Sequence, residues 1–199
     1  LWFHVDGAHG LGVLFSEKYR HLARGLEFAD SVVIDFHKML LTPGLNTMII
    51  FRDGRRSYET FAQKARYLFE KHDGNEWYNS ARRTLECTKS GLGIVAWAVI
   101  RYYGEEALGR YVESRHDLAR RFGDAIGRTA EMELAVTPES NIVCFRYAPA
   151  GAGADRLNEL NRMIRKSVIQ SGEFYLVQTE LDGAIWLRTA LMNAMTDDG

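Results

Sequence analysis

Two apolar segments, each followed at once by residues with reactive side chains, constrain this chain more than any other feature. Residues 1–5 are mostly apolar and run into Asp6, and residues 31–36 repeat the pattern shortly before Lys38. An apolar run bounded by polar and turn-forming residues is typical of a buried strand. If both segments are parallel strands of one sheet, the carboxylate and the amine emerge at the same edge of that sheet.

The first half of the chain has the element order of an α/β sheet. Apolar residues recur at helical spacing between Phe15 and Leu26, which predicts a helix that crosses over between two parallel strands. A third strand is predicted over residues 47–52. The dense apolar pattern of residues 91–103 predicts a buried helix that stops at Gly104.

The second half has a different order of elements. A long amphipathic helix is predicted over residues 106–126. The order strand, strand, helix, strand, strand follows, which indicates an α+β unit with an antiparallel sheet. The predicted ranges of these five elements are 132–136, 141–147, 155–171, 174–178 and 184–191. We place a soft domain boundary near residue 105, which separates residues 1–105 from residues 106–199.

The composition argues against nucleic acid and membranes as partners. A net charge of −1 gives no bulk attraction to either polyanion, and no apolar run approaches the roughly 18 residues that span a bilayer. The two cysteines, Cys87 and Cys144, are far apart and lack the spacing of metal ligands. We therefore expect no metal site, and free thiols in a reduced, cytoplasmic compartment.

An acid, a small residue and an amine at one sheet edge are the groups that a pyridoxal phosphate site needs. The carboxyl ends of parallel strands form the ligand crevice of open α/β sheets. A lysine amine such as that of Lys38 can form a Schiff base with an aldehyde. A carboxylate such as Asp6 can keep the pyridine nitrogen protonated, so that the ring accepts electrons released at Cα. The small side chain of Ala8 leaves room for a flat ring.

Four segments, in this order, resemble the group II pyridoxal-phosphate amino acid decarboxylases: HVDGAHG, ADSVVIDFHKML, RTLECTK and WLRTALMN. This family contains the aromatic amino acid, glutamate, cysteine sulfinate and diaminobutyrate decarboxylases. The resemblance extends along essentially the whole chain. It implies an α/β fold, with part of a fold-type I transferase large domain and a small α+β carboxy-terminal domain. It also implies pyridoxal 5'-phosphate as cofactor, an amino acid substrate and a homodimer.

The resemblance also assigns roles to four residues of the first half. Lys38 is implied to be the lysine that bonds the cofactor, and Asp6 the partner of the pyridinium nitrogen. Ala8 is implied to pack against the cofactor ring, and His37 to lie near its phosphate.

Two further roles, and two departures from the family pattern, lie at single positions. Tyr78, in a loop predicted over residues 72–80, matches the tyrosine of the family's catalytic loop. Arg188 matches an arginine that meets the substrate carboxylate. His9 stands where many relatives carry Tyr, and Asp35 stands where some carry Asn.

The sequence therefore predicts decarboxylation of an L-amino acid to an amine and carbon dioxide. Because the chain lacks a match to the family's amino-terminal half, we expect it to be incomplete for activity, with a longer chain or a second polypeptide supplying the remainder. Two alternatives stay open. One is the aldehyde-forming branch of the family, which the resemblance ties to loss of the loop tyrosine. The other is a truncated, catalytically silent partner of a full-length relative.

Overall fold

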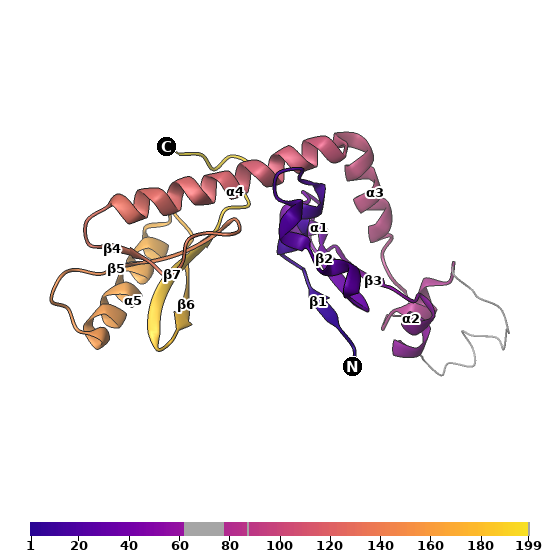
Figure 1. Ribbon diagram of the computed structural model, residues 1–199, viewed down its shortest axis with the longest axis horizontal. Coiled ribbons are helices and arrows are strands. Elements are labelled where there is room, and N and C mark those ends of the chain that lie inside the picture. Colours follow the sequence, from indigo (N-terminus) through magenta and orange to yellow (C-terminus); the bar gives the residue numbers. More distant parts are fainter. Residues whose placement is uncertain (62–77, 87, 199) are drawn as a thin grey trace. The chain divides into compact units, whose positions relative to one another are not determined.

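The computed structural model describes residues 1–61, 78–86 and 88–198. The chain divides into two compact units, Leu1–Gly109 and Arg110–Gly199, whose elements are labelled in Figure 1. The division falls inside one long helix, α4 (Glu105–Arg128).

The first unit contains a sheet of three strands in the order β1-β2-β3. These strands are β1 (His4–Asp6), β2 (Ser31–Asp35) and β3 (Thr47–Phe51). Strands β1 and β2 are parallel, with Asp6 opposite Val33, as the sequence predicts. Strand β3 is antiparallel to β2 and pairs Thr47 with Asp35. Asp6 and Asp35 are therefore the last residues of two neighbouring parallel strands.

The connection between β1 and β2 differs from the predicted helix. It consists of three short 3-10 turns, η1 (Gly10–Phe15), η2 (Arg20–Ala23) and η3 (Leu26–Phe28). Ser16 interrupts a continuous helix because its backbone is extended and its hydroxyl accepts a hydrogen bond from the Tyr19 N–H at 2.8 Å. Gly25 interrupts it again, with a φ of 92° that favours glycine.

The first unit also contains four further helical segments, of which α1 and α3 contribute to one small core. They are α1 (Phe36–Met39), α2 (Arg55–Thr60), η4 (Ser80–Arg83) and α3 (Leu92–Tyr103). The core consists of buried residues from η1, β2, α1 and α3 and from the residue after α1: Leu11, Ile34, Phe36, Leu40 and Ala96.

Helix α3 is not buried, contrary to the sequence prediction. Ala96 is buried and Ile100 packs on the core, and this four-residue spacing defines a single contact face. On the rest of the helix, Ile94, Trp97 and Tyr102 are 71%, 63% and 83% exposed. Apolar residues lie on all sides of α3, but among the described residues only the face with Ala96 and Ile100 packs on the core.

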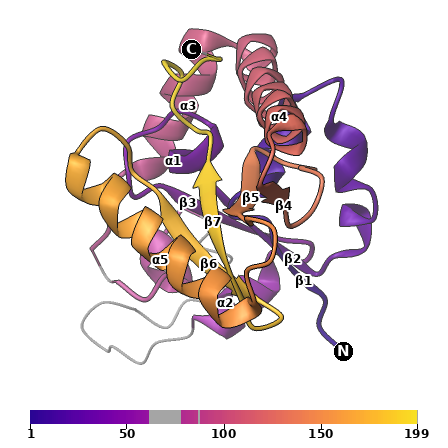
Figure 2. The same cartoon turned by 90° about the vertical axis from the view of Figure 1, so that its left-hand side faces the viewer.

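The second unit is an antiparallel sheet with the strand order β4-β5-β7-β6. Its elements after α4 are β4 (Met132–Leu134), β5 (Ile142–Tyr147), α5 (Ala154–Ser171), β6 (Val177–Leu181) and β7 (Ala184–Ala190). Helix α5 packs on β7, as the view in Figure 2 shows. The buried core joins α4 to the sheet through Ala119, Ile126, Val143, Phe145 and Leu187. The predicted α+β unit is confirmed.

One strand of this sheet lies further along the chain than predicted. Strand β6 begins at Val177 instead of residue 174, because the turn at Asp182 and Gly183 sets its register against β7. Both turn residues have positive φ, 50° and 74°, which matches the twist of a two-residue hairpin. Leu181 therefore pairs with Ala184.

Candidate active site

The exit of β1 forms one side of the candidate site. The carboxylate of Asp6 is exposed, and its Oδ1 accepts a hydrogen bond from the Ala8 N–H at 3.1 Å. The Gly7 N–H donates to the Val33 carbonyl of β2 at 3.1 Å. This short loop is therefore fixed to the neighbouring strand β2. Within it, the Asp6 side chain is exposed and Ala8 is half-buried.

The exit of β2 forms the other side and is linked to the first by the backbone. The Asp35 N–H donates to the Ala8 carbonyl at 3.1 Å, so the two exits lie next to each other. The predicted strand over residues 31–36 is one residue too long, because α1 begins at Phe36 and its carbonyl accepts the Leu40 N–H. Lys38 consequently lies on a short helical turn, one residue after His37.

The amine of Lys38 forms an ion pair with Asp35. The Nζ–Oδ2 distance is 2.8 Å, and the two side chains are 32% and 10% exposed. The other carboxylate oxygen of Asp35 accepts a hydrogen bond from the Thr47 hydroxyl of β3. Burial alone would raise the pKa of Asp35, but the hydrogen bonds from Lys38 and Thr47 outweigh it and hold the pKa below its ordinary value. Asp35 is therefore a charged carboxylate at neutral pH.

His37 is oriented by the backbone of Asn46. The Asn46 N–H lies 3.1 Å from Nδ1 of the imidazole, and the Asn46 carbonyl already accepts the Phe36 N–H at 2.8 Å. The Asn46 carbonyl oxygen also lies 3.1 Å from Nδ1, so whether Nδ1 accepts from the N–H or donates to the carbonyl depends on the tautomer of the ring. Nε2 lies 3.8 Å from Oδ2 of Asp35. The buried side chain of Asn46 donates in turn to the Leu92 carbonyl at 3.1 Å, which links the loop to α3.

The structure thus brings together four of the six predicted site residues at one edge of one sheet. The four are Asp6, Ala8, His37 and Lys38. Tyr78 is 71% exposed and is the first described residue after residues 62–77, so most of the predicted loop at 72–80 lies outside the described residues. Cys87 lies outside them as well.

Arg188 belongs to the second unit, on β7. It is half-buried and pairs with Cys144 of β5 and Val177 of β6 across the sheet. Burial raises the pKa of the Cys144 thiol, although the positive charge of Arg188 opposes the rise. In the part of the chain that the structure describes, Arg188 makes no ion pair with a carboxylate.

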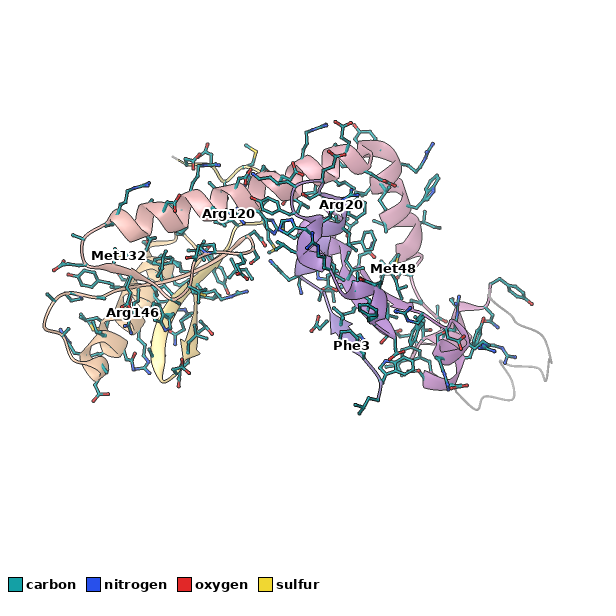
Figure 3. All side chains as sticks on the ribbon, viewed as in Figure 1. Phe3, Arg20, Met48, Arg120, Met132 and Arg146 are labelled. Carbon is teal, nitrogen blue, oxygen red and sulfur yellow. The ribbon has the colours of Figure 1, made fainter. Side chains whose placement is uncertain are left out.

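The guanidinium group of a second arginine, Arg146, is already engaged by neighbouring side chains. Arg146 of β5, labelled in Figure 3, forms an ion pair with Glu133 of β4 at 2.7 Å. Its guanidinium carbon also lies 4.3 Å from the ring centre of Trp186. The carboxylate and the indole together fix this guanidinium, so Arg146 serves as a structural contrast to Arg188.

Sequence reasoning missed the roles of Thr47, Asn46 and Asp35 in holding the site together. A signal was present for Asp35, because a carboxylate three residues before a lysine at a helix start is in ion-pair range. The sequence carried no such signal for Asn46 and Thr47, since the partners of these residues depend on how the loop after α1 returns to β3.

Two searches of the described residues bear on metals and membranes. Within residues 1–61, 78–86 and 88–198, His, Cys, Asp and Glu side chains form no group of three that could hold a metal ion. No helix in the same residues is both long and apolar enough to cross a bilayer.

Solved structures resemble the fold along the whole chain. The crystal structure of mouse CSAD matches with a TM-score of 0.86 at 23% identity, over 100% of this chain and 43% of that one. The structure of Oryza sativa TDC with PLP and tryptamine matches with a TM-score of 0.82 at 26% identity, over 98% of this chain and 41% of that one. The predicted α/β fold class is confirmed by these neighbours.

Curated relatives cover a range of decarboxylase chemistry. Tyrosine decarboxylase 2 of Arabidopsis thaliana is 27% identical over 199 residues, which are 100% of this chain and 36% of the relative. L-2,4-diaminobutyrate decarboxylase of Acinetobacter baumannii is 28% identical over 99% of this chain and 39% of the relative. Phenylacetaldehyde synthase of Arabidopsis thaliana is 27% identical over 100% of this chain and 41% of the relative.

The chain therefore spans about two fifths of the length of the relatives that it matches. A family model, the pyridoxal-dependent decarboxylase conserved domain, matches residues 1–148. That match includes both strand exits and the Lys38 turn. The chain belongs to the pyridoxal-dependent decarboxylase family.

Proposed function

We propose that the protein decarboxylates an L-amino acid to the corresponding amine and carbon dioxide with pyridoxal 5'-phosphate as cofactor. The observation that carries this proposal is the juxtaposition of the Asp6 carboxylate and the Lys38 amine. They stand at the exits of two neighbouring parallel strands, in a chain of the pyridoxal-dependent decarboxylase family. This edge is where open α/β sheets bind ligands.

The residues at this edge fit pyridoxal phosphate. The cofactor carries an aldehyde, a pyridine nitrogen and a phosphate, which need an amine, a carboxylate and hydrogen-bond donors respectively. Lys38 supplies the amine and Asp6 an exposed carboxylate. His37 is oriented by the Asn46 backbone, and an imidazole N–H is a donor that suits a phosphate oxygen. The methyl group of Ala8 leaves space for the ring.

Each residue acts on a different part of the reaction. Lys38 would hold the cofactor through its amine. When bound, pyridoxal phosphate accepts the electrons released as the bond from Cα to the carboxylate breaks. Asp6 holds the proton on the pyridine nitrogen that makes this acceptance favourable. We assign the return of a proton to Cα to the phenol of Tyr78, since a phenol retains its proton at neutral pH.

We further propose that Arg188 binds the carboxylate of the substrate. Support comes from the contrast with Arg146, whose guanidinium is occupied by Glu133 and Trp186. If this is right, Arg188→Met raises the KM for the amino acid at least tenfold, since a charge-assisted pair contributes about 1.5–3 kcal/mol. Arg146→Met is the matched control and should affect stability more than KM. Equal KM values in the two variants would exclude this role of Arg188.

The experiment that tests the central proposal maps the cofactor to its lysine. The full-length protein is incubated with pyridoxal phosphate, reduced with borohydride, digested and analysed by mass spectrometry. We expect the pyridoxyl group on Lys38 and its loss in Lys38→Ala. Labelling of Lys89 or Lys166 instead would refute the site. The same protein should release carbon dioxide from one of the glutamate, aspartate, cysteine sulfinate, diaminobutyrate or aromatic substrates.

A second candidate function is the aldehyde-forming reaction, which consumes oxygen and releases ammonia. It is favoured by one observation, the likeness to phenylacetaldehyde synthase at 27% identity. The presence of Tyr78 favours amine formation instead, so the ratio of amine to aldehyde in the product separates the two. A silent partner of a longer relative would hold no cofactor at Lys38.

Three further proposals concern the domains, the assembly and the location. We propose that residues 1–105 form part of the cofactor-binding large domain and residues 106–199 the small carboxy-terminal domain. We propose a homodimer, with the remaining part of the large domain supplied by the full-length chain or by a second polypeptide. A cytoplasmic location is supported by Cys144, a free thiol.

A further inference from the structure

Asp35 is a carboxylate at the candidate site to which the proposed reaction assigns no role. Its side chain is only 10% exposed, and its Oδ2 lies 2.8 Å from the amine of Lys38. Its other oxygen accepts the Thr47 hydroxyl. A carboxylate in this setting is costly to leave without a cation, because burial weakens its hydration.

The backbone fixes this pair more firmly than most ion pairs of the surface. Asp35 ends β2 and precedes α1, and Lys38 lies three residues later on that helix. The Asp35 N–H is bonded to the Ala8 carbonyl and Thr47 is held opposite Asp35 by the β2–β3 register. Asp35 is thus held from both neighbouring strands, so its carboxylate stays in place when the longer Lys38 side chain moves.

We propose, building on the function proposed above, that Asp35 is a positioning residue that receives the Lys38 ammonium group whenever this nitrogen is not bonded to the cofactor. To bond the cofactor, the Lys38 nitrogen would leave Asp35, release one proton to solvent and attack the aldehyde carbon. The aldehyde oxygen would depart as water with the two protons that remain on the nitrogen. When the amine of a substrate displaces Lys38, the freed nitrogen regains its proton and returns to Asp35.

The groups that face Asp35 make Lys38 the main cation at this carboxylate. From α1, His37 also approaches it, but its Nε2 lies at 3.8 Å, beyond hydrogen-bond distance. From β3 the Thr47 hydroxyl approaches, and from the loop after β1 the Ala8 carbonyl lies at the Asp35 backbone; both groups are uncharged. The lowered pKa of Asp35 agrees with this arrangement.

The proposal is tested by the pH dependence of cofactor capture. Full-length protein freed of cofactor is mixed with pyridoxal phosphate, and the rate of the absorbance change is measured from pH 6 to pH 10. In Asp35→Asn the midpoint of this profile should move to lower pH, and capture below the wild-type midpoint should become faster, because the carboxylate that attracts the Lys38 ammonium group is gone. Asp35→Glu retains the charge and should restore a midpoint near that of the wild type.

Two control variants separate this effect from a general disturbance. Thr47→Val removes a hydrogen bond from the same carboxylate but no charge, and should leave the midpoint within about 0.3 pH units. Asp53→Asn removes an equal charge from an exposed pair with Arg55 and should behave likewise. If Asp35→Asn does not fold, the wild-type protein alone suffices. Lys38 should then react with acetic anhydride more slowly than the exposed Lys166 does at the same pH, because Asp35 engages its nitrogen, as followed by mass spectrometry.

The outcomes distinguish this proposal from the function on which it rests. Capture at Lys38 with an unmoved midpoint in Asp35→Asn would overturn the role of Asp35 alone. So would acetylation of Lys38 as fast as that of Lys166. No capture by the wild-type protein, or undiminished capture by Lys38→Ala, would overturn the proposed function together with it.

Discussion

Replacing Gly7 by alanine should destabilise the protein and disturb the cofactor edge at the same time. Gly7 lies between Asp6 and Ala8, and the structure leaves no space for a side chain there. A Cβ added to Gly7 would lie 2.1 Å from Cδ1 and 2.2 Å from Cγ of Leu11. It would also lie 3.0 Å from the Val33 carbonyl oxygen, which is part of β2. The close contacts are therefore mainly with one side chain.

The magnitude follows from the surroundings of Leu11. This side chain is 6% exposed and belongs to the core with Ile34, Phe36 and Leu40, so it cannot simply rotate into solvent. Forcing an extra carbon into such a core costs about 1–3 kcal/mol. Leu11→Ala alone should cost about 2–5 kcal/mol through lost burial and the resulting cavity. In the double variant the atoms that clash with the new Cβ are gone, so the two costs should not add.

The assay is a double-mutant cycle by urea unfolding of the wild-type protein, Gly7→Ala, Leu11→Ala and the double variant. We expect the double variant to be more stable than the sum of the single effects by about 1–3 kcal/mol. The affinity for pyridoxal phosphate should fall in Gly7→Ala and recover in part in the double variant. Additivity within about 0.5 kcal/mol, or a neutral Gly7→Ala, would refute this account of the β1 exit.

Three further predictions concern charges and protons. Asp6→Asn should bind cofactor yet lose about 3 kcal/mol of transition-state stabilisation, measured as kcat; near-normal turnover would leave Asp6 as an ordinary strand-end acid. Tyr78→Phe should lower amine output and raise aldehyde output and oxygen consumption; unchanged amine output would show that Tyr78 is a bystander. Because the pKa of Asp35 is lowered by folding, its contribution to stability is complete above the unfolded value near 4 and disappears as pH falls through the lower folded value. Urea midpoints between pH 2 and pH 6 should therefore decline less steeply in Asp35→Asn, and parallel curves would contradict this.

The sheet at the candidate site was predictable because the composition of its first two strands is typical of buried strands. Apolar residues bounded by polar ones marked both β1 and β2, and chain order was enough to expect them to be parallel. The hairpin of the second unit carried an equally clear signal, Asp182 followed by Gly183, which the predicted strand ranges did not use. Because the predicted ranges did not use this turn signal, the predicted strand begins earlier along the chain than β6 does.

The connection between the strands was not predictable from periodicity. Apolar residues at helical spacing from Phe15 to Leu26 are also produced by successive 3-10 turns that each bury a residue or two. What decides between them is whether Ser16 and Gly25 interrupt the helix, and both do so through local backbone conformation. The exposure of α3 was beyond sequence reasoning too, since periodicity reports which residues are apolar and not what covers them.

The least predictable part of the site is the contact between Lys38 and Asp35. Sequence alone placed Lys38 at a strand end, where it would project freely from the sheet. The structure places it on the α1 turn, and only this turn brings its amine within 2.8 Å of Asp35. The sequence resemblance implies Asn at the Asp35 position in some relatives, and an amide oxygen accepts a hydrogen bond from an ammonium group without supplying a negative charge. We therefore expect a relative with Asn at this position to capture the cofactor at lower pH than this protein. A survey in which Asp and Asn enzymes share one midpoint would show that the ion pair does not control capture of the cofactor.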